Sequence, residues 1–150
     1  LQTALQRSGA LQGGTLQGVR IVNAVACLPP KNRPLAAEVR TCGDRWLQQE
    51  VDAHTTILAL GKVAHDAVLA RHGLRPQAAR FAHGAVHPLG STVLFDSFHP
   101  SPLNTRTGRL SPEAFCRAVF VAVEAALHPA LSSRQLDASQ SEPGGQHRPD

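Results

Sequence analysis

TTILALGKVAHDAVL (residues 55–69) and VLFDSFHP (residues 93–100) are the two stretches that decide the fold of this chain. Each begins with a short, mostly apolar run that is typical of a strand covered on both faces. In the first stretch, Gly61 separates the strand from a helix predicted over Lys62–His72. In the second stretch, His99 follows the strand directly.

Further segments repeat this alternation of strands and helices. Such alternation predicts an α/β domain in which helices cover both faces of a parallel sheet. Before the two decisive stretches, the sequence predicts the end of a helix over Leu1–Gly9, a loop at Gly13-Gly14 and a strand over Val19–Cys27. A helix is then predicted from Asn32, with Pro34 in its first turn, to about Val51, and its apolar stripe is Leu35, Val39, Trp46 and Leu47. Strands over Thr55–Leu60 and Val93–Phe98 lie on either side of the Lys62–His72 helix, and a last helix begins at Ser111-Pro112 and carries Phe115, Val119, Val123 and Leu127 on one face.

Composition limits the domain organisation and the location. A chain of 150 residues with 42% hydrophobic content suits one domain. We expect that domain over residues 1–128 and a disordered polar tail over residues 129–150. The apolar runs are too short to cross a membrane, and three cysteines without an export signal indicate a cytoplasmic location. The chain begins with Leu1 and contains no Met, which suggests a piece of a longer protein.

The positive charge is concentrated around His99. The whole chain carries a formal net charge of +4. The segment from residue 62 to residue 110 has the same surplus, because Asp66 and Asp96 are its only acidic residues and its basic residues are Lys62, Arg71, Arg75, Arg80, Arg106 and Arg109. A basic surface beside a site attracts phosphates. Scattered arginines that only keep the protein in solution remain an equal alternative.

Polar residues at the ends of the predicted strands are the candidate functional groups. In α/β sheets, ligands bind where the strands end at their carboxyl edge, and Asn23, Gly61 and His99 are all expected there. A histidine fixed at that edge can donate a hydrogen bond to developing negative charge. An amide can read the polar edge of a base. The alternatives are an ordinary loop histidine and a turn-forming asparagine.

Two sets of residues could bind a metal. Cys27 and Cys42 are separated by fourteen residues, and two thiolates held in this way can share a metal or a cluster. Two ligands are half of such a site, so buried, inert cysteines remain the alternative. The second set is His83, His87, Asp96 and His99, in a stretch where glycines and a proline argue against a helix.

Several motifs together resemble one enzyme family. They are NAVAC (residues 23–27), PPKNRP (residues 29–34), Cys42, ALGKVAHDAVL (residues 59–69), FAHGAVH (residues 81–87) and DSFHPSPLNTRTGRLSPEAF (residues 96–115). In this order and spacing they resemble the iron–sulfur uracil-DNA glycosylases of the family 5 (type b) branch. The resemblance covers about Val19 to Phe120.

The resemblance implies a fold, an activity and a cofactor. It implies a three-layer α/β/α sandwich with a central parallel sheet, whose amino-terminal part is missing, in a monomeric enzyme. This enzyme removes uracil, and in this branch other deaminated bases, from DNA. Cys27 and Cys42 match two of the four ligands of a 4Fe-4S cluster, Asn23 matches the residue that reads the uracil edge, and His99 matches the histidine that hydrogen-bonds the leaving base. The segment Ser101–Gly108, with Asn104 and Arg106, matches the loop that enters the minor groove, and Arg109 adds to its basic surface.

Departures from the family pattern qualify this reading. No residue here matches the first family motif, its Cys-x-x-Cys pair or its water-activating carboxylate. Ala26 stands where the family usually has Arg, and Pro102-Leu103 replaces a typical Arg-Gln. We therefore expect the 150 residues alone to be inactive or nearly so. Two alternatives stay open: a non-catalytic nucleic-acid-binding remnant, and a metal-dependent hydrolase that uses His83, His87 and His99.

Overall fold

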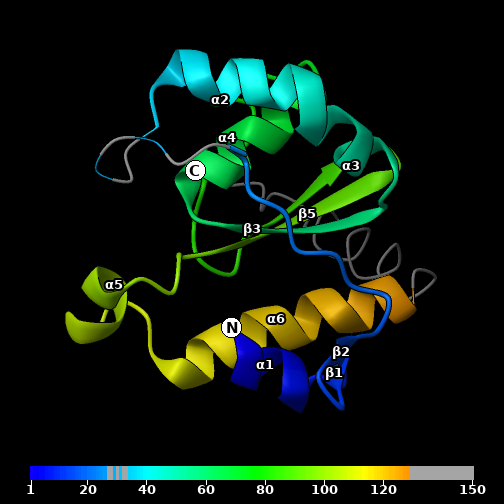
Figure 1. The fold of residues 1–150 in the computed structure, drawn as a ribbon, viewed down its shortest axis with the longest axis vertical. Helices are drawn as coiled ribbons and strands as arrows, with labels where there is room; N and C mark the ends of the chain where they lie inside the picture. The colour runs from blue at the N-terminus through cyan, green and yellow to red at the C-terminus, as the bar shows by residue number, and fades with distance from the viewer. Residues whose placement is uncertain (27–28, 30, 32–33, 129–150) are drawn as a thin grey trace, which may run out of the picture.

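The protein is built of three layers, with helices above and below one small sheet (Figure 1). The computed structural model describes residues 1–26, 29, 31 and 34–128. Its elements are α1 (Gln2–Arg7), β1 (Leu11–Gln12), β2 (Thr15–Leu16), α2 (Ala36–Cys42), the π-helical turn η2 (Gly43–Leu47), α3 (Gln48–Asp52), β3 (Thr56–Leu60), α4 (Lys62–Arg71), β4 (Val86–Leu89), β5 (Thr92–Ser97), α5 (Pro102–Arg106) and α6 (Pro112–Leu127). The α/β/α sandwich is confirmed.

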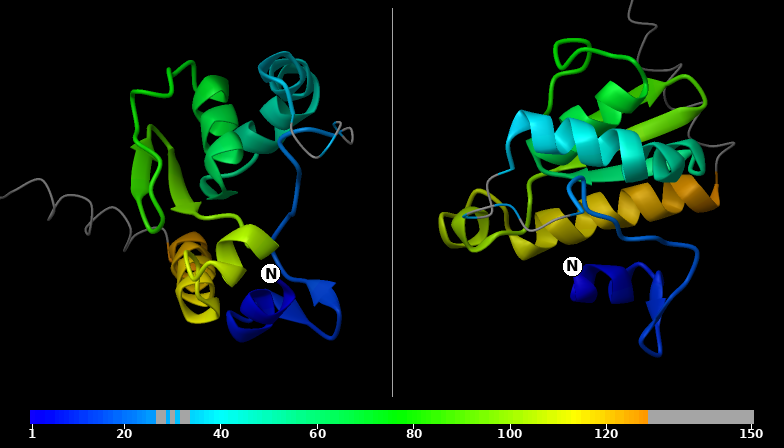
Figure 2. Two further views of the ribbon diagram at one scale, coloured as in Figure 1. Left: turned by 90° about the vertical axis from the view of Figure 1, so that its left-hand side faces the viewer. Right: turned by 45° about the horizontal axis from the view of Figure 1, so that its top comes forward.

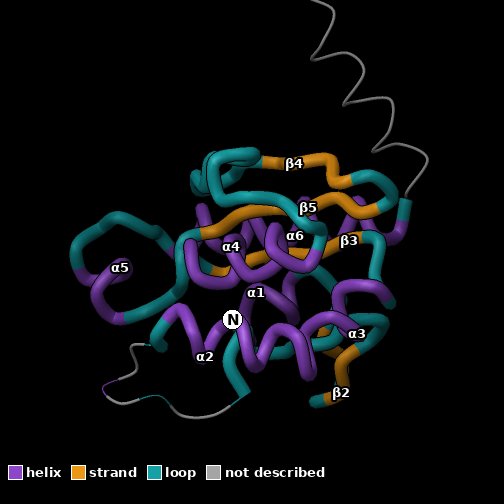
Figure 3. The backbone as a smooth tube through the Cα atoms, turned by 90° about the horizontal axis from the view of Figure 1, so that it is seen from above, coloured by secondary structure: helices purple, strands orange, loops and turns teal. Residues whose placement is uncertain are grey.

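The sheet is mixed, which corrects the prediction of a parallel one. Its strand order is β3-β5-β4, so that β5 lies in the middle (Figure 3). β3 and β5 are parallel, and β4 pairs antiparallel with β5. Only Gly90 and Ser91 join β4 to β5, and a connection this short can only link antiparallel strands. Pro88 fits in β4 because this strand lies at the edge of the sheet.

The sheet separates two hydrophobic cores. The upper core packs α3 and α4 against β3 and β5, and the lower core packs α1 and α6 against the opposite face (Figure 2). Leu94 of β5 and Leu69 of α4 are fully buried in the upper core, and Val119 of α6 is 1% exposed in the lower one. Both faces of the sheet are therefore covered, as the two apolar runs predict.

The helices and strands near the decisive stretches agree closely with prediction. The strands over Thr55–Leu60 and Val93–Phe98 and the helix over Lys62–His72 are found as β3, β5 and α4, within one residue at each end. The helix predicted to end at Gly9 is α1. The Gly13-Gly14 loop is the turn of a small hairpin, β1–β2, which the sequence analysis did not expect.

The strand predicted over Val19–Cys27 is wrong for the part that the structure describes. Residues 19–26 form irregular backbone, and Cys27 lies outside the described residues. Alternating side chains favour a strand only where a neighbouring strand supplies hydrogen bonds. The described strands pair only as β1–β2 and β3-β5-β4, and the segment joins neither sheet.

The helix predicted from Asn32 begins later than expected. Asn32 lies outside the described residues, and α2 begins at Ala36, after Leu35 in an extended conformation. The Leu35 backbone N–H donates to Glu38 Oε2 at 2.7 Å, so Glu38 takes over the capping role. Helical backbone then continues to Asp52, close to the predicted end.

The apolar stripe predicted for this helix is only partly buried. Leu47 is buried, but Leu35 is 67% and Trp46 59% exposed. Leu35 is exposed because it precedes the helix, and the π-helical turn over Gly43–Leu47 adds a residue to one turn, which rotates Trp46 away from a regular stripe. Among the helices of the described residues, none is long and apolar enough to span a bilayer.

Candidate active site

His99 lies where the two parallel strands end. β3 ends at Leu60 and β5 at Ser97, and these residues are paired in register. The Gly61 backbone N–H donates to the Ser97 carbonyl at 2.8 Å, which holds the two strand ends together. A Cβ on Gly61 would lie 3.3 Å from His99 Cβ, so glycine permits this close approach. The prediction that Gly61 and His99 share the carboxyl edge is confirmed.

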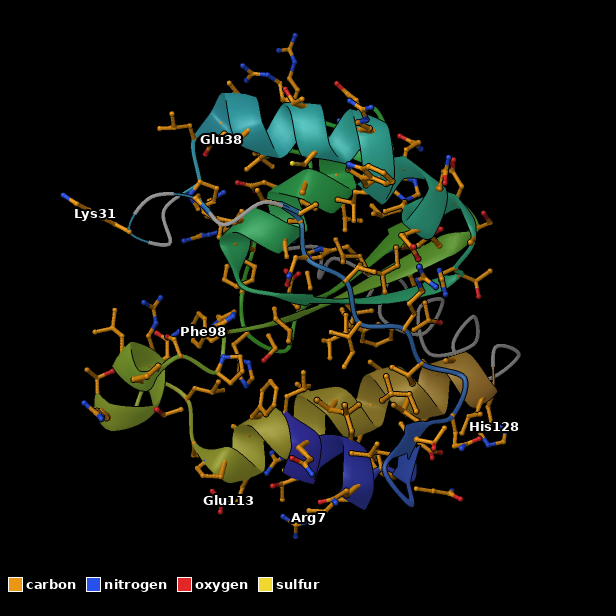
Figure 4. The ribbon with its side chains drawn as sticks, viewed as in Figure 1. Arg7, Lys31, Glu38, Phe98, Glu113 and His128 are labelled. Carbon is orange, nitrogen blue, oxygen red and sulfur yellow. The ribbon has the colours of Figure 1, made fainter. Side chains whose placement is uncertain are left out.

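A cavity of about 340 Å³ opens beside His99. Its lining residues come from the β3–α4 junction, the segment between α4 and β4, and the stretch from the end of β5 to α6: Leu60, Gly61, Lys62, Val63, Phe81, Phe98, His99, Asn104 and Arg109. Phe98 forms an aromatic wall, tilted against Phe81 at a centroid separation of 5.9 Å, and lies near α5 in Figure 4. The lining residues named here include no carboxylate. The cavity therefore combines apolar walls with a few hydrogen-bond donors, which is typical of a small-molecule site.

The segment after His99 is a short helix, which corrects the prediction of a loop. The Ser101 side chain accepts a hydrogen bond from the Asn104 backbone N–H at the start of α5. The Asn104 side-chain amide donates to the His99 carbonyl at 2.8 Å. Both side chains, which the resemblance assigns to DNA binding, thus also fix the backbone around His99. Leu103 on the same helix is 73% exposed.

Arg109 and Arg106 supply the positive charge of this end of the molecule. The Arg109 guanidinium lies over the Phe98 ring, 4.3 Å from its centroid. Arg106 is exposed in the last turn of α5. Two other basic residues of the predicted cluster are neutralised, because Lys62 forms an ion pair with Asp66 and Arg71 forms one with Asp44. The basic surface is therefore narrower than the sequence suggests.

Asn23 is not brought into the cavity. It is exposed in the irregular segment over residues 19–26 and is absent from the lining residues. The two residues after Asn23 hold this segment against the protein, since Val25 is buried and Ala24 packs against the upper core. The expected strand end, which would have fixed the amide, does not exist in the described residues.

One of the two predicted cluster ligands can be located. Cys42 ends α2 and is a free, half-buried thiol, followed immediately by the π-helical turn. Cys27 lies outside the described residues. The Arg71 guanidinium packs against Gly43, where a Cβ would lie 3.2 Å from its central carbon. The described residues therefore place one thiol at the junction of α2 and the π-helical turn, and its role as a ligand stays a prediction.

The alternative metal site does not assemble among the described residues. His83 accepts a hydrogen bond from the Phe98 backbone N–H and stacks on its ring, while His99 is exposed at the cavity. His87 instead contacts Asp96, and His65 completes this buried group. The sequence analysis missed His65. Two features of the sequence could have indicated His65. It is a polar residue among the apolar residues of a predicted helix, and Asp96 is a polar residue among the apolar residues of a predicted strand.

Fold and site together define an α/β domain with a cavity at the carboxyl edge of its sheet. The family model of the uracil-DNA glycosylase superfamily matches residues 1–121, and the chain belongs to this superfamily.

Known relatives give the same family. The chain is 43% identical over 111 residues to a type-5 uracil-DNA glycosylase of Thermus thermophilus, in a match that covers 71% of this chain and 50% of that protein. It is 41% identical over 109 residues to the enzyme of that name from Pyrobaculum aerophilum, covering 71% and 47%. It is 39% identical over 127 residues to the one from Mycobacterium bovis, covering 75% and 47%. The chain spans about half the length of these relatives.

We expect Gly61→Ala to lower the free energy of unfolding by about 2–4 kcal/mol, measured by urea denaturation. Gly61 has φ +97° and ψ 163°, a region that is almost restricted to glycine, and the new methyl group would press on His99. Gly73→Ala is the matched control, because Gly73 has φ +70° but open space around it. We expect a loss of about 1 kcal/mol there. Equal losses in the two variants would show that the contact with His99 is unimportant.

Proposed function

We propose that this chain is part of a DNA repair glycosylase. The whole enzyme cleaves the N-glycosidic bond of uracil, and of other deaminated bases, in DNA. The observation that carries the proposal is the placement of His99 at the mouth of a cavity, beside Arg109, in a member of this superfamily. A cavity of about 340 Å³ falls within the range usual for small ligands. A base flipped out of the duplex is a ligand of suitable size and polarity.

His99 has a defined part in this chemistry. Cleavage of the N-glycosidic bond develops positive charge on the sugar and negative charge on the leaving base. An imidazole N–H that donates to the base oxygen stabilises that anion, and one well-placed donor contributes about 3 kcal/mol. The hydrogen bond from Asn104 to the His99 carbonyl supports the backbone at this position. In this proposal Asn23 reads the base edge, which requires the segment over residues 19–26 to approach the cavity.

α5 suits contact with the duplex. It projects at one end of the sheet (Figure 3), and its Leu103 side chain is exposed. An exposed apolar side chain can enter a base step and hold the helix open, while basic side chains bind the flanking phosphates. In this proposal Arg106, in the last turn of the same helix, and Arg109, at the cavity, supply those basic side chains. Phosphate binding and the wedge together would offset the few kcal/mol that base flipping costs.

His99→Ala tests the catalytic proposal. With the chain in excess over an oligonucleotide that carries one uracil, we expect slow release of uracil, because no carboxylate lines the cavity in the described residues to position the attacking water. His99→Ala should slow the release about 100- to 1,000-fold, measured as alkali-labile sites on a gel.

His128→Ala is the matched control, since His128 lies at the far end of α6 (Figure 4) and should leave the rate unchanged. Equal release by the wild-type chain and His99→Ala would contradict the role of His99. Tight binding of uracil-containing DNA without any release would instead favour the non-catalytic nucleic-acid-binding alternative.

Arg106→Ala should weaken DNA binding in a salt-dependent way. We expect the slope of log K against log salt concentration to fall by about 0.9 for each phosphate contact that is lost, measured by fluorescence anisotropy. Arg7→Ala is the control, because Arg7 lies on α1 at the lower edge of the molecule (Figure 4). A slope that changes equally in both variants would mean that binding depends on net charge and not on α5.

The proposal includes a 4Fe-4S cluster with Cys27 and Cys42 as two of its four ligands. Such a cluster would be structural and would tie the proline-rich segment after residue 27 to α2. We expect Cys42→Ser to remove most of the iron and the visible absorbance of the purified chain. Cys116→Ser is the matched control, since Cys116 is also a free, half-buried thiol but lies on α6. Iron bound by the wild-type chain that remains in both variants would rule out Cys42 as a ligand.

Location and assembly form the last part of the proposal. The free thiols of Cys42 and Cys116 suit a reducing compartment, so we assign the protein to the cytoplasm, where it acts on DNA as a monomer.

A further inference from the structure

Three side chains outside the cavity form a buried polar network between α4 and the sheet. Asp96 of β5 is 1% and His65 of α4 0% exposed. Asp96 Oδ1 lies 2.9 Å from His65 Nδ1, and Asp96 Oδ2 lies 3.0 Å from His87 Nε2. The second ring nitrogen of His65, Nε2, lies 3.0 Å from the Ala79 carbonyl oxygen. The described mechanism uses none of these groups.

The geometry fixes where the protons are. A neutral imidazole carries one N–H and one lone pair, but both ring nitrogens of His65 face acceptor oxygens. Nε2 therefore donates to the Ala79 carbonyl, and a proton must also lie between Nδ1 and Asp96 Oδ1. We place it on Nδ1, because an imidazole is a stronger base than a carboxylate. His87 donates its Nε2 proton to the other carboxylate oxygen. Every polar atom that meets in this network has a partner, as burial requires.

The network connects the two backbone segments that meet at His99. The His65 backbone N–H donates to the Gly61 carbonyl at 3.1 Å, and Gly61 lies so close to His99 that a Cβ on it would be 3.3 Å from His99 Cβ. Asp96 precedes His99 by three residues, and its strand neighbour Ser97 accepts the Gly61 N–H. A shift of Asp96 relative to His65 would therefore move the two halves of the His99 environment apart.

We propose that His65, Asp96 and His87 are positioning residues, which fix His99 against Gly61 through the proton shared by His65 and Asp96. This proposal rests on the proposed function only in that His99 is taken to be the catalytic residue. A metal ion is the rival occupant, because the ligand atoms of the three side chains lie within 4.8 Å of one another. Bonds of about 2.0–2.2 Å to a tetrahedral zinc would hold ligand atoms about 3.3 Å apart. The observed separations of 2.9 and 3.0 Å are hydrogen-bond lengths instead.

Ring nitrogen signals in NMR spectra of the ¹⁵N-histidine-labelled chain test the proposal without DNA. In the wild-type chain we expect both nitrogens of His65 to be protonated and His99 to give one sharp set of signals. In Asp96→Asn, the amide can donate to His65 Nδ1 and accept from His87, so Nδ1 should lose its proton while the His99 signals stay unchanged. Asp96→Ala deletes both contacts and should shift and broaden the His99 signals.

Two further variants keep the test decisive. His87→Gln removes one of the two histidines and should shift the His99 signals less than Asp96→Ala does. It serves in place of Asp96→Ala if the Asp96→Ala variant does not fold. His54→Gln is the control, because the hydrogen bond of the His54 side chain is to the Glu50 carbonyl, four residues earlier, and the variant should not affect His99. An unprotonated His65 Nδ1 in the wild-type chain overturns the proposal. The proposal is also overturned if neither Asp96→Ala nor His87→Gln changes the His99 signals. It is overturned as well if the wild-type chain binds one equivalent of zinc and Asp96→Asn does not.

Discussion

The parallel pairing of β3 with β5 is the constraint on which the rest of the molecule depends. Parallel strands end at the same edge, so residues 37 positions apart in the chain, Leu60 and Ser97, become neighbours. The Gly61 N–H closes this edge by donating to the Ser97 carbonyl. His99, the aromatic cavity and the start of α4 all take their positions from this one register. A slip of one residue would exchange the faces of β5 and disrupt both cores.

The sheet also explains how polar groups survive inside so small a domain. Asp96 stands in the central strand, among residues that are otherwise apolar or small, where a lone carboxylate would cost several kcal/mol. Two histidines from different elements, one on α4 and one on β4, satisfy its two oxygens. The antiparallel strand β4 is therefore more than an edge: it delivers His87 to the carboxylate that β5 carries.

Sequence patterns predicted the parts of the fold whose neighbours lie close in the chain. The segments that form β3, α4 and β5 are followed by residues that end strands or helices, namely Gly61, Gly73 and Pro100. The bounds of these three elements were therefore predicted to within one residue. Long-range pairing was not predictable in the same way. β4 was missed because its Pro88 argues against a strand unless the strand is known to lie at an edge. The Val19–Cys27 strand failed over residues 19–26 because alternation cannot show whether a neighbour is present. At the site, His99, Asn104 and Arg109 could be named from motifs, whereas His65 could not, because its partner lies 31 residues away.

The hydrogen bond from the Asn104 side chain to the His99 carbonyl links mechanics to chemistry. α5 has only five residues, so it has little stability of its own, and this hydrogen bond is one of the contacts that hold it beside the strand end. A displacement of α5 that kept the hydrogen bond would also displace the backbone that carries the imidazole. The exposed helix and the side chain that lines the cavity are therefore coupled mechanically through one amide.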